Sequence, residues 1–484
     1  MLFNSTNFAL FLPIVFIGYW FLFNKHLKIQ NSFLLLSSYF FYSCWDWRFV
    51  FLLLFSTLLD YYAGLKIAAS TNQMNKKIWL WASVCINVGF LAFFKYFNFF
   101  IESFTDLLLL FGIHTNIWML NIILPIGISF YTFHGLSYII DIYYNRINPE
   151  KSFVTYALFV SFFPLLVAGP IERATHLLPQ IKQSRIFNSI YATDGLRQML
   201  WGFFKKLVIA DNCGLLVDNI FKNYESLPGS TIFLGGLLFY FQIYCDFSGY
   251  SDIAIGVARL FGIQLMQNFR FPLFATSFED NWRRWHISLS SWLRDYIYIP
   301  LGGGRNGLFL KIRNILIVFF ISGLWHGPKW TFIIWGILNA VLLIIETLMK
   351  QSKSIVMPTH IKRKALIPDF RALIQMVTVF MVVGSTYFFF RSDSLAQSIS
   401  MYKTIFSKTF FAIPRGAGLS NWIYITLITF FVIIEWVGKD NKHALETLFD
   451  SYAKPIRWSF YSFIIFLIAL YGIGDGIKFI YFQF

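Results

Sequence analysis

Two stretches, SFEDNWRRWHISLSSWLRDYIYIPLGGGR at residues 277–305 and ISGLWHGPKW at residues 321–330, decide the fold of this chain. Taken as one helix, the first stretch places its aromatic side chains and His286 on one face and its charged side chains on the other. Ser277 followed by Asp280 is typical of a helix start, and Pro300 with the glycines after it ends the helix. An aromatic face opposite an arginine-rich face predicts a helix lying in the membrane plane.

The second stretch places a histidine deep in apolar sequence. Eleven uncharged residues, 315–325, precede His326, and a longer apolar run, 330–345, follows it. At about 1.5 Å per helical residue, the first run reaches about 16 Å into a hydrocarbon core about 30 Å thick. Gly327 and Pro328 cannot continue a smooth helix, so we expect a break or a re-entrant corner there. Broken backbone at this depth requires surrounding protein or a water-filled cavity, where an imidazole can take a proton from an attacking hydroxyl.

The composition predicts an all-α membrane protein. Hydrophobic residues make up 57% of the 484 residues, aromatic residues 21% and charged residues only 13%, which excludes a soluble globular protein. We expect about 10–12 transmembrane helices. The net charge of +16 resides in short loops, which indicates cytoplasmic loops and contact with anionic membrane lipids, not nucleic acid. The four cysteines are scattered singly and predict neither a metal site nor a disulfide framework.

The basic loops after the first and third apolar runs set the expected orientation. Lys25 and Lys28 follow the first run, and Lys76 and Lys77 follow the third; placing both loops in the cytoplasm puts the N-terminus outside. The first run has no basic region before it, so we interpret it as a retained span and not a signal peptide. The expected spans lie near residues 8–23, 32–44, 49–69, 78–97, 117–144, 199–221, 231–262, 371–390, 420–437 and 457–475.

Three segments depart from simple alternation. Residues 98–116 are amphipathic enough to lie at the outer surface, and the span 117–144 is interrupted at Pro125 and Gly127. We interpret 153–169 as re-entrant, because positive charges follow it on the side that it would lead to, and 350–371 as a cytoplasmic loop. The whole of 1–484 is expected to form a single membrane domain, with peripheral N-terminal spans at about 1–115, a core at about 117–350 and C-terminal spans at about 370–484.

Each candidate site also has a structural interpretation. His326 is either a base or a buried histidine satisfied by a neighbouring helix, and His286 either lines the route of an acyl donor or bonds a backbone carbonyl. Residues 244–252 carry Asp246 and Asp252 in an apolar run; they form a polar pocket wall, a locally unwound helix or, as we favour, an interhelical hydrogen-bond network, with a metal pair least favoured.

Two further motifs remain open. Residues 302–305, Gly-Gly-Gly-Arg, lack the lysine and spacing of a phosphate-binding P-loop, so we interpret them as a flexible turn with an arginine that can meet an anion. The aromatic C-terminus, FIYFQF at 479–484, is either an anchor at the membrane interface or a tail that reaches into a pore.

These motifs together resemble the membrane-bound O-acyltransferase family. The resemblance rests on NWRRWHISLS at 281–290 with its continuation to Arg305, on residues 246–252 and on LWHG at 324–327. The continuation YIPLGG at 298–303 is most similar to the branch that contains the alginate O-acetyltransferase membrane subunit and its peptidoglycan-acetylating relatives. The D-alanyl-transferring branch is less similar after Arg294.

The resemblance implies a funnel-shaped core of helices with in-plane and re-entrant elements. It implies His326 as the catalytic histidine and His286 as the family's second histidine, with no bound cofactor and no metal. The acyl group is expected to come from a cytosolic thioester, with acetyl-CoA as the co-substrate. It is expected to cross the bacterial cytoplasmic (inner) membrane to an extracytoplasmic partner protein that acylates a polysaccharide. The residues expected to support the pocket are Trp282, Trp285, Arg294, Asp246, Asp252 and Trp325.

The C-terminal residues carry a second resemblance. Phe479, Tyr481 and Phe484 are spaced as in the terminal motif of the small carrier peptide of D-alanylation systems, whose tyrosine holds the acyl group briefly. This resemblance implies that Tyr481 is an acyl relay, beside the interpretation as an anchor.

Two other functions compete with acyl transfer. A transporter or polysaccharide-export subunit without chemistry of its own would also use broken helices at the membrane midplane. Paired interruptions in both halves of the chain would be expected of it, whereas the interruptions fall mainly in the second half. The other alternative is a structural anchor for an extracytoplasmic enzyme.

Overall fold

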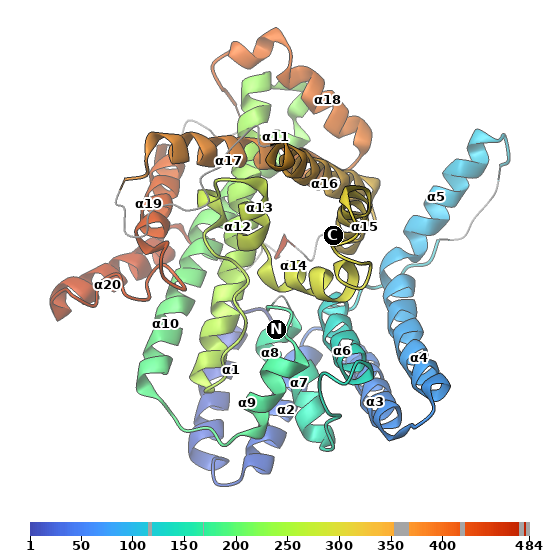
Figure 1. Ribbon diagram of the computed structural model, residues 1–484. Coiled ribbons are helices and arrows are strands. Elements are labelled where there is room, and N and C mark those ends of the chain that lie inside the picture. The colour runs from blue at the N-terminus through green and yellow to red at the C-terminus, as the bar shows by residue number, and fades with distance from the viewer. Residues whose placement is uncertain (115–118, 168, 353–366, 417–421, 474–478, 481–484) are drawn as a thin grey trace. The chain divides into compact units, whose positions relative to one another are not determined.

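The protein is an all-α, multi-pass membrane protein, as the composition predicts (Figure 1). The computed structural model describes residues 1–114, 119–167, 169–352, 367–416, 422–473 and 479–480. Within these ranges the regular elements are helices, and no strand occurs. Among the described residues, six helices are long and apolar enough to cross a membrane, and the segments Thr6–Leu22 and Trp422–Gly438 are shorter apolar helices. The chain forms two compact units.

The first unit contains residues Met1–Ala192 and Val257–Met266. Its α3 packs against α4 and α6 around Asp60, whose Oδ1 accepts hydrogen bonds from Ser83 Oγ at 2.6 Å and Asn87 Nδ2 at 2.8 Å. A cavity of about 270 Å³ in this unit is lined by residues that include Trp20, Arg185 and Arg259, and by none of the predicted site residues. The helices of the unit are α1 (Thr6–Ile17), α2 (Leu27–Ser43), α3 (Arg48–Ala69), α4 (Gln73–Leu91), α5 (Phe97–Leu110), α6 (Ile128–Tyr143), α7 (Phe153–Ser161), α8 (Phe163–Leu166) and α9 (Ala174–Lys182).

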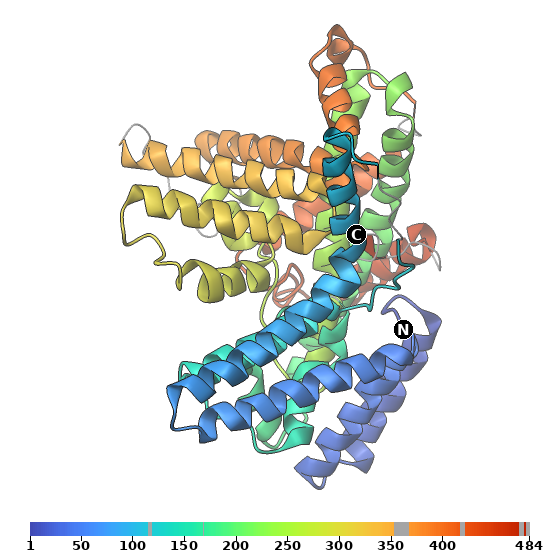
Figure 2. The ribbon, with the colours of Figure 1, turned by 90° about the vertical axis from the view of Figure 1, so that its right-hand side faces the viewer.

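Two boundaries in the first unit differ from the prediction. The segment predicted over 98–116 begins earlier, because α4 continues through a π-helical turn, Ala92–Tyr96, into α5 (Figure 2); its place at the outer surface stays a prediction. Residues 119–127 are not helical, so the predicted span 117–144 is a helix only from Ile128, after Gly127 at φ 78°. Its residues 115–118 lie outside the described ranges. Residues 153–166 form two short helices, of which α7, about 14 Å long, is too short to cross a core of about 30 Å by itself; the re-entrant path stays a prediction.

The second unit contains residues Thr193–Gly256 and Gln267–Phe484 and carries both histidine motifs. Helix α12 is continuous over 32 residues, so residues 244–252 are not unwound. Helices α15, α16 and α17 pack in sequence beside one another (Figure 2). The helices of the unit are α10 (Ser189–Phe203, which begins in the first unit), α11 (Asp211–Lys222), α12 (Gly229–Leu260, which ends in the first unit), α13 (Phe278–Arg284), α14 (Ile287–Leu293), α15 (Leu308–His326), α16 (Trp330–Gln351), α17 (Phe370–Arg391), α18 (Leu395–Ile405), α19 (Trp422–Gly438) and α20 (Lys454–Tyr471).

Glycines bring α15 and α16 into backbone contact. A Cβ atom added at Gly323 would lie 2.5 Å from Phe332 O, and one added at Gly336 would lie 2.3 Å from Phe319 O. Small residues at such positions let helices approach closely in a membrane, where packing contributes much of the association energy. The close approach fixes the hairpin at whose turn His326 lies.

We predict that Gly336→Ala weakens this hairpin. The added methyl group collides with the backbone of α15, and overpacking of this kind costs about 1–3 kcal/mol. Gly89→Ala is the matched control: Gly89 is also in a spanning helix, but nothing lies within 4 Å of its added Cβ, so the helix propensity of alanine should make the change neutral or slightly stabilising. Thermal unfolding of the two purified variants in detergent compares them. Equal unfolding temperatures would refute the proposed backbone contact.

Candidate active site

His326 is the last residue of α15, at the break expected from Gly327 and Pro328. Helix α16 starts four residues later, at Trp330. The His326 side chain is 4% exposed, and its ring centroid lies 5.1 Å from that of Trp325, 5.0 Å from that of Trp335 and 5.1 Å from that of Phe390. Three aromatic rings from α15, α16 and α17 therefore enclose the imidazole. The water-filled passage expected at His326 stays a prediction.

His286 lies at a break in the predicted in-plane helix. The sequence predicted one continuous helix, but the structure has α13 and α14 joined at His286, which adopts the left-handed conformation at φ 42° and ψ 54°. The predicted helix start is correct, because Ser277 Oγ accepts the N–H of Asp280 at 3.1 Å. Periodicity could not reveal the break because both halves keep the same apolar pattern. A left-handed non-glycine residue at a candidate site points to a constraint from its surroundings.

A neighbouring extended segment supplies that constraint. The N–H of Ile287 donates to Asn268 O at 2.8 Å, and the N–H of Arg270 donates to Arg284 O at 2.9 Å. The buried Asn268 side chain also accepts from Ser288 Oγ at 2.9 Å and donates to Ser251 Oγ of α12 at 3.0 Å. These bonds take up backbone groups freed by the break and tie α14 to α12.

The His286 ring is buried in an aromatic environment. It is 1% exposed, and its centroid lies 4.6 Å from that of Phe247, nearly perpendicular to it, and 5.5 Å from that of Trp325. Within the part of the chain that the structure describes, neither ring nitrogen has a hydrogen-bond partner, so the predicted bond to a backbone carbonyl does not occur there. Burial lowers the pKa of His286 to about 3, which keeps the imidazole neutral at pH 7. Trp325 contacts both histidines.

Of the other residues predicted to support the pocket, Trp282 and Trp285 lie near the histidines, whereas Arg294 does not. Trp285 is buried against Phe269, Tyr240 and Tyr387, and Trp282 packs on Phe319 and Trp335. Arg294 is different: its side chain is 62% exposed and pairs with the adjacent Asp295 at 2.8 Å. Unlike the two tryptophans, Arg294 is exposed and has an acidic partner next to it in the chain, and its predicted support of the pocket stays a prediction. Residues 302–304 form the predicted turn, and Gly303 O accepts from Asn314 Nδ2 at 2.8 Å.

Asp246 and Asp252 confirm the predicted interhelical network. Asp252 lies 2.5 Å from Lys205 Nζ and accepts from Gln198 at 2.7 Å, and Asp246 lies 2.8 Å from Lys206 Nζ. The lysines lie in the π-helical segment Phe204–Ala210 that continues α10. Glycines again permit the contact, since a Cβ at Gly202 of α10 would lie 2.6 Å from the carbonyl oxygen of Gly249 in α12.

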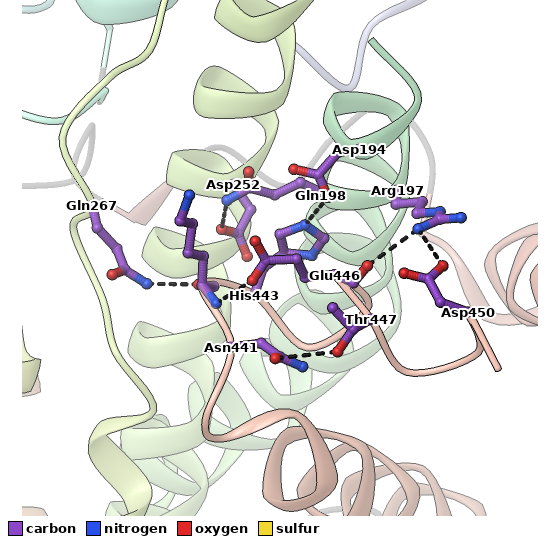
Figure 3. A network of polar contacts seen from close by, with 11 residues as sticks. Asp194, Arg197, Gln198, Asp252, Gln267, Asn441, His443, Glu446, Thr447 and Asp450 are labelled. Atoms are coloured by element: carbon purple, nitrogen blue, oxygen red, sulfur yellow. Dashed lines mark hydrogen bonds and ion pairs between the residues drawn. The ribbon is translucent and has the colours of Figure 1, made fainter. Parts of the chain in front are cut away.

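The same network extends to the loop between α19 and α20, as Figure 3 shows. His443 Nε2 lies 2.8 Å from Asp194 Oδ1, and Arg197 donates to Asp450 Oδ1 at 3.0 Å. Gln198, one turn further along α10, reaches Asp252. Polar groups therefore connect this loop through α10 to α12.

Several residues of the candidate site were missed from the sequence. The enclosing rings of Trp335 and Phe390 belong to ordinary-looking apolar helices, and nothing local marks them. Lys205 and Lys206 did carry a signal: two cations inside an apolar run need partners, and Asp246 and Asp252 were the obvious candidates. Tyr481 lies outside the described residues.

Comparison with known proteins identifies the family. Residues 146–389 match the family model described as MBOAT, membrane-bound O-acyltransferase family. The chain belongs to this family. It is therefore a membrane acyltransferase, and the resemblance inferred from the histidine motifs is confirmed. The matched range includes α12, the His286 break and the hairpin that carries His326.

The chain is also similar to named relatives over most of its length. It is 36% identical to the probable alginate O-acetylase AlgI of Azotobacter vinelandii over 90% of this chain and 85% of that protein. It is 36% identical to the peptidoglycan O-acetyltransferase of Helicobacter pylori over 83% of this chain and 79% of that protein. The teichoic acid D-alanyltransferase of Bacillus subtilis is 28% identical over 46% of this chain and 59% of that protein. These similarities favour an enzyme over the transporter and the structural anchor.

We predict that Lys205 and Asp252 stabilise the fold only as a pair, so that removing one of them costs more stability than removing both. Lys205→Met alone leaves a largely buried carboxylate without its cation, and breaking a buried pair in this way costs about 3–5 kcal/mol. The double variant Lys205→Met/Asp252→Leu removes both charges and should recover part of that loss. Unfolding of the two variants in detergent tests this. A double variant no more stable than Lys205→Met would show that the pair does not account for the loss.

Proposed function

We propose that this enzyme transfers an acetyl group from a cytosolic thioester to a hydroxyl group, for O-acetylation of an extracytoplasmic polysaccharide. Acetyl-CoA would be the co-substrate, and the bacterial cytoplasmic membrane would be the location. The observation that carries the proposal is His326: in a chain of an acyltransferase family, a nearly buried imidazole lies at the broken end of an apolar helix. Such a placement is costly for a polar group and is typical of a functional residue.

His326 would act as the general base. Its imidazole takes the proton of the acceptor hydroxyl as the hydroxyl oxygen attacks the thioester carbonyl carbon. The carbon–sulfur bond then breaks, and the departing thiolate takes the proton from His326, so that base and charge are restored. A positioned general base contributes about 10²–10⁴ in rate. The rings of Trp325, Trp335 and Phe390, which pack around the imidazole, would help to hold it in place for this proton transfer.

His286 would line the path of the acyl donor. It is neutral at pH 7 and shares Trp325 with His326, so it belongs to the same aromatic environment without contributing charge. A weakly polar, uncharged wall suits a thioester, whose acyl group and sulfur are poorly hydrated.

Tyr481 would carry the acetyl group between donor and final acceptor. In that step the hydroxyl attacked at His326 is the phenol of Tyr481, and the product is an aryl ester that an extracytoplasmic partner protein could use. The acceptor polymer is proposed from the relatives, one named for alginate and another for peptidoglycan. Both are 36% identical to this chain, so identity does not select between the two polymers.

We predict that His326→Ala reduces acetyl transfer by at least about 10²-fold, because the general base is lost. Purified protein in liposomes, given labelled acetyl-CoA, measures transfer, and membrane abundance shows whether the variant folds. His176→Gln is the control, since His176 is a partly exposed histidine of the first unit that pairs with Glu172. Transfer by His326→Ala at more than about half the wild-type rate would remove His326 from the mechanism.

We predict that Tyr481→Phe abolishes label transfer to the protein, because the ring is kept and only the hydroxyl is lost. Mass spectrometry of the C-terminal peptide after incubation with labelled acetyl-CoA should find an acetyl group in the wild type and none in the variant. Full acetylation of the acceptor polymer by Tyr481→Phe would rule out the relay, while leaving the role of His326 intact.

A further inference from the structure

Two residues near the C-terminus, Phe479 and Ile480, are buried in the second unit. Phe479 is 1% exposed and Ile480 is 2% exposed, so protein covers these two residues. The backbone N–H of Ile480 donates to Asp246 Oδ2 of α12 at 2.7 Å, across 234 residues of sequence. Of the two interpretations of the C-terminus, the interfacial anchor does not fit these two residues, because lipid-facing side chains would not be covered by protein.

The carboxylate of Asp246, which accepts this hydrogen bond, is also fixed by an ion pair. Asp246 Oδ1 lies 2.8 Å from Lys206 Nζ, and the same Nζ lies 2.8 Å from Asp211 Oδ1. All three side chains are at most 4% exposed. One cation therefore serves two buried carboxylates. Because a buried carboxylate oxygen needs a donor, the Ile480 amide satisfies the oxygen of Asp246 that Lys206 does not reach.

Aromatic contacts connect Phe479, the residue before Ile480, to His286 through Phe247. The Phe479 ring lies 4.7 Å from the ring of Tyr250 and 6.0 Å from that of Phe247. Phe247 in turn contacts His286 edge to face at 4.6 Å. Asp246, Phe247 and Tyr250 lie within one helical turn or so of α12, so a single helix presents both the hydrogen-bond acceptor and the rings.

We infer that Asp246, oriented by Lys206, is the positioning residue that seats the C-terminal segment through the Ile480 amide. Tyr481 is the next residue in the sequence after Ile480. The inference rests on the proposed function: if Tyr481 is an acyl relay, its hydroxyl must come back to the thioester site at each turnover, and a fixed residue beside it would ensure this. Asp246 acts through the tail and needs no contact with the acyl group.

Hydrogen–deuterium exchange of the full-length protein in detergent, followed on the C-terminal peptide, tests the seat. Ile480→Pro removes the N–H and leaves Asp246 and Lys206 unchanged, and Ile480→Val is its control because it keeps the N–H. We expect exchange in the C-terminal peptide to rise at least tenfold in Ile480→Pro and to stay within twofold of wild type in Ile480→Val. Equal protection in the two variants would overturn the proposal.

Asp246→Leu tests the same bond from the other side. Its matched control is Asp252→Leu, which removes another acid of α12 that pairs with a lysine of the same π-helical segment. Tail exchange should rise in Asp246→Leu and not in Asp252→Leu. An equal rise in both would mean general loosening of α12 and would overturn the proposal. If Asp246→Leu does not fold, the Ile480 variants decide alone.

Kinetics separate this inference from the proposed function. With a seated tail required for transfer, Ile480→Pro should lower kcat for acetyl transfer at least tenfold, with KM for acetyl-CoA within twofold of wild type. If Ile480→Pro loses activity while its C-terminal peptide stays protected from exchange, the role of the Ile480–Asp246 hydrogen bond is refuted. The acyltransferase mechanism would then still stand. A wild-type enzyme without acetyl transfer would refute the proposed function, whereas the exchange experiment would still decide whether Asp246 holds the tail.

Discussion

Inside a membrane, every break in a helix exposes backbone donors and acceptors that lipid cannot satisfy, and this constraint shapes the second unit. At His286 the constraint is met by residues 268–270, which bond both to the residue after the break and to the one two positions before it. At His326 it is met by a tight turn, in which the N–H of Lys329 donates to Gly327 O at 3.0 Å and that of Phe332 donates to Lys329 O at 3.2 Å. Both histidines therefore lie where the helical pattern stops and the surrounding protein takes over.

Helix α12 organises the charged part of the same unit. It carries Asp246 and Asp252, each facing one of two adjacent lysines, and Tyr244, whose hydroxyl donates to Glu435 Oε2 of α19 at 2.6 Å. Trp201 of α10 donates to the other oxygen of Glu435 at 2.8 Å. Buried charges of this kind stabilise a fold only when each has its partner, which makes them specific for one arrangement of helices. Ile480 joins this arrangement through its backbone N–H, which donates to Asp246.

The sequence predicted the features that depend on local pattern and failed where distant parts of the chain meet. Long apolar runs predicted the all-α membrane class, Ser277 predicted a helix start, and Gly327-Pro328 predicted the break at His326. The apolar runs overstated the number of spans, since about 10–12 were expected and six helices among the described residues are long and apolar enough to cross a membrane. The break at His286 was missed because it is imposed by Asn268, a residue outside the helical pattern. The helix over 119–127 was wrongly predicted because apolar composition alone does not make a helix, and Pro125 and Gly127, the latter at φ 78°, lie at its end. The rings around His326 come from three helices, and no local pattern links them.

The glycine contacts between α15 and α16 have a consequence for how substrates can reach His326. Because the two backbones touch at Gly323 and Gly336, the hairpin has no room to shear, and the imidazole and the Trp335 indole must travel as one rigid piece. The ring of Phe390, whose centroid lies 5.1 Å from that of the imidazole, belongs to another helix, α17. One of the rings that enclose the base is therefore carried by a helix outside the hairpin, so that a displacement of α17 would move Phe390 without moving His326 relative to Trp335.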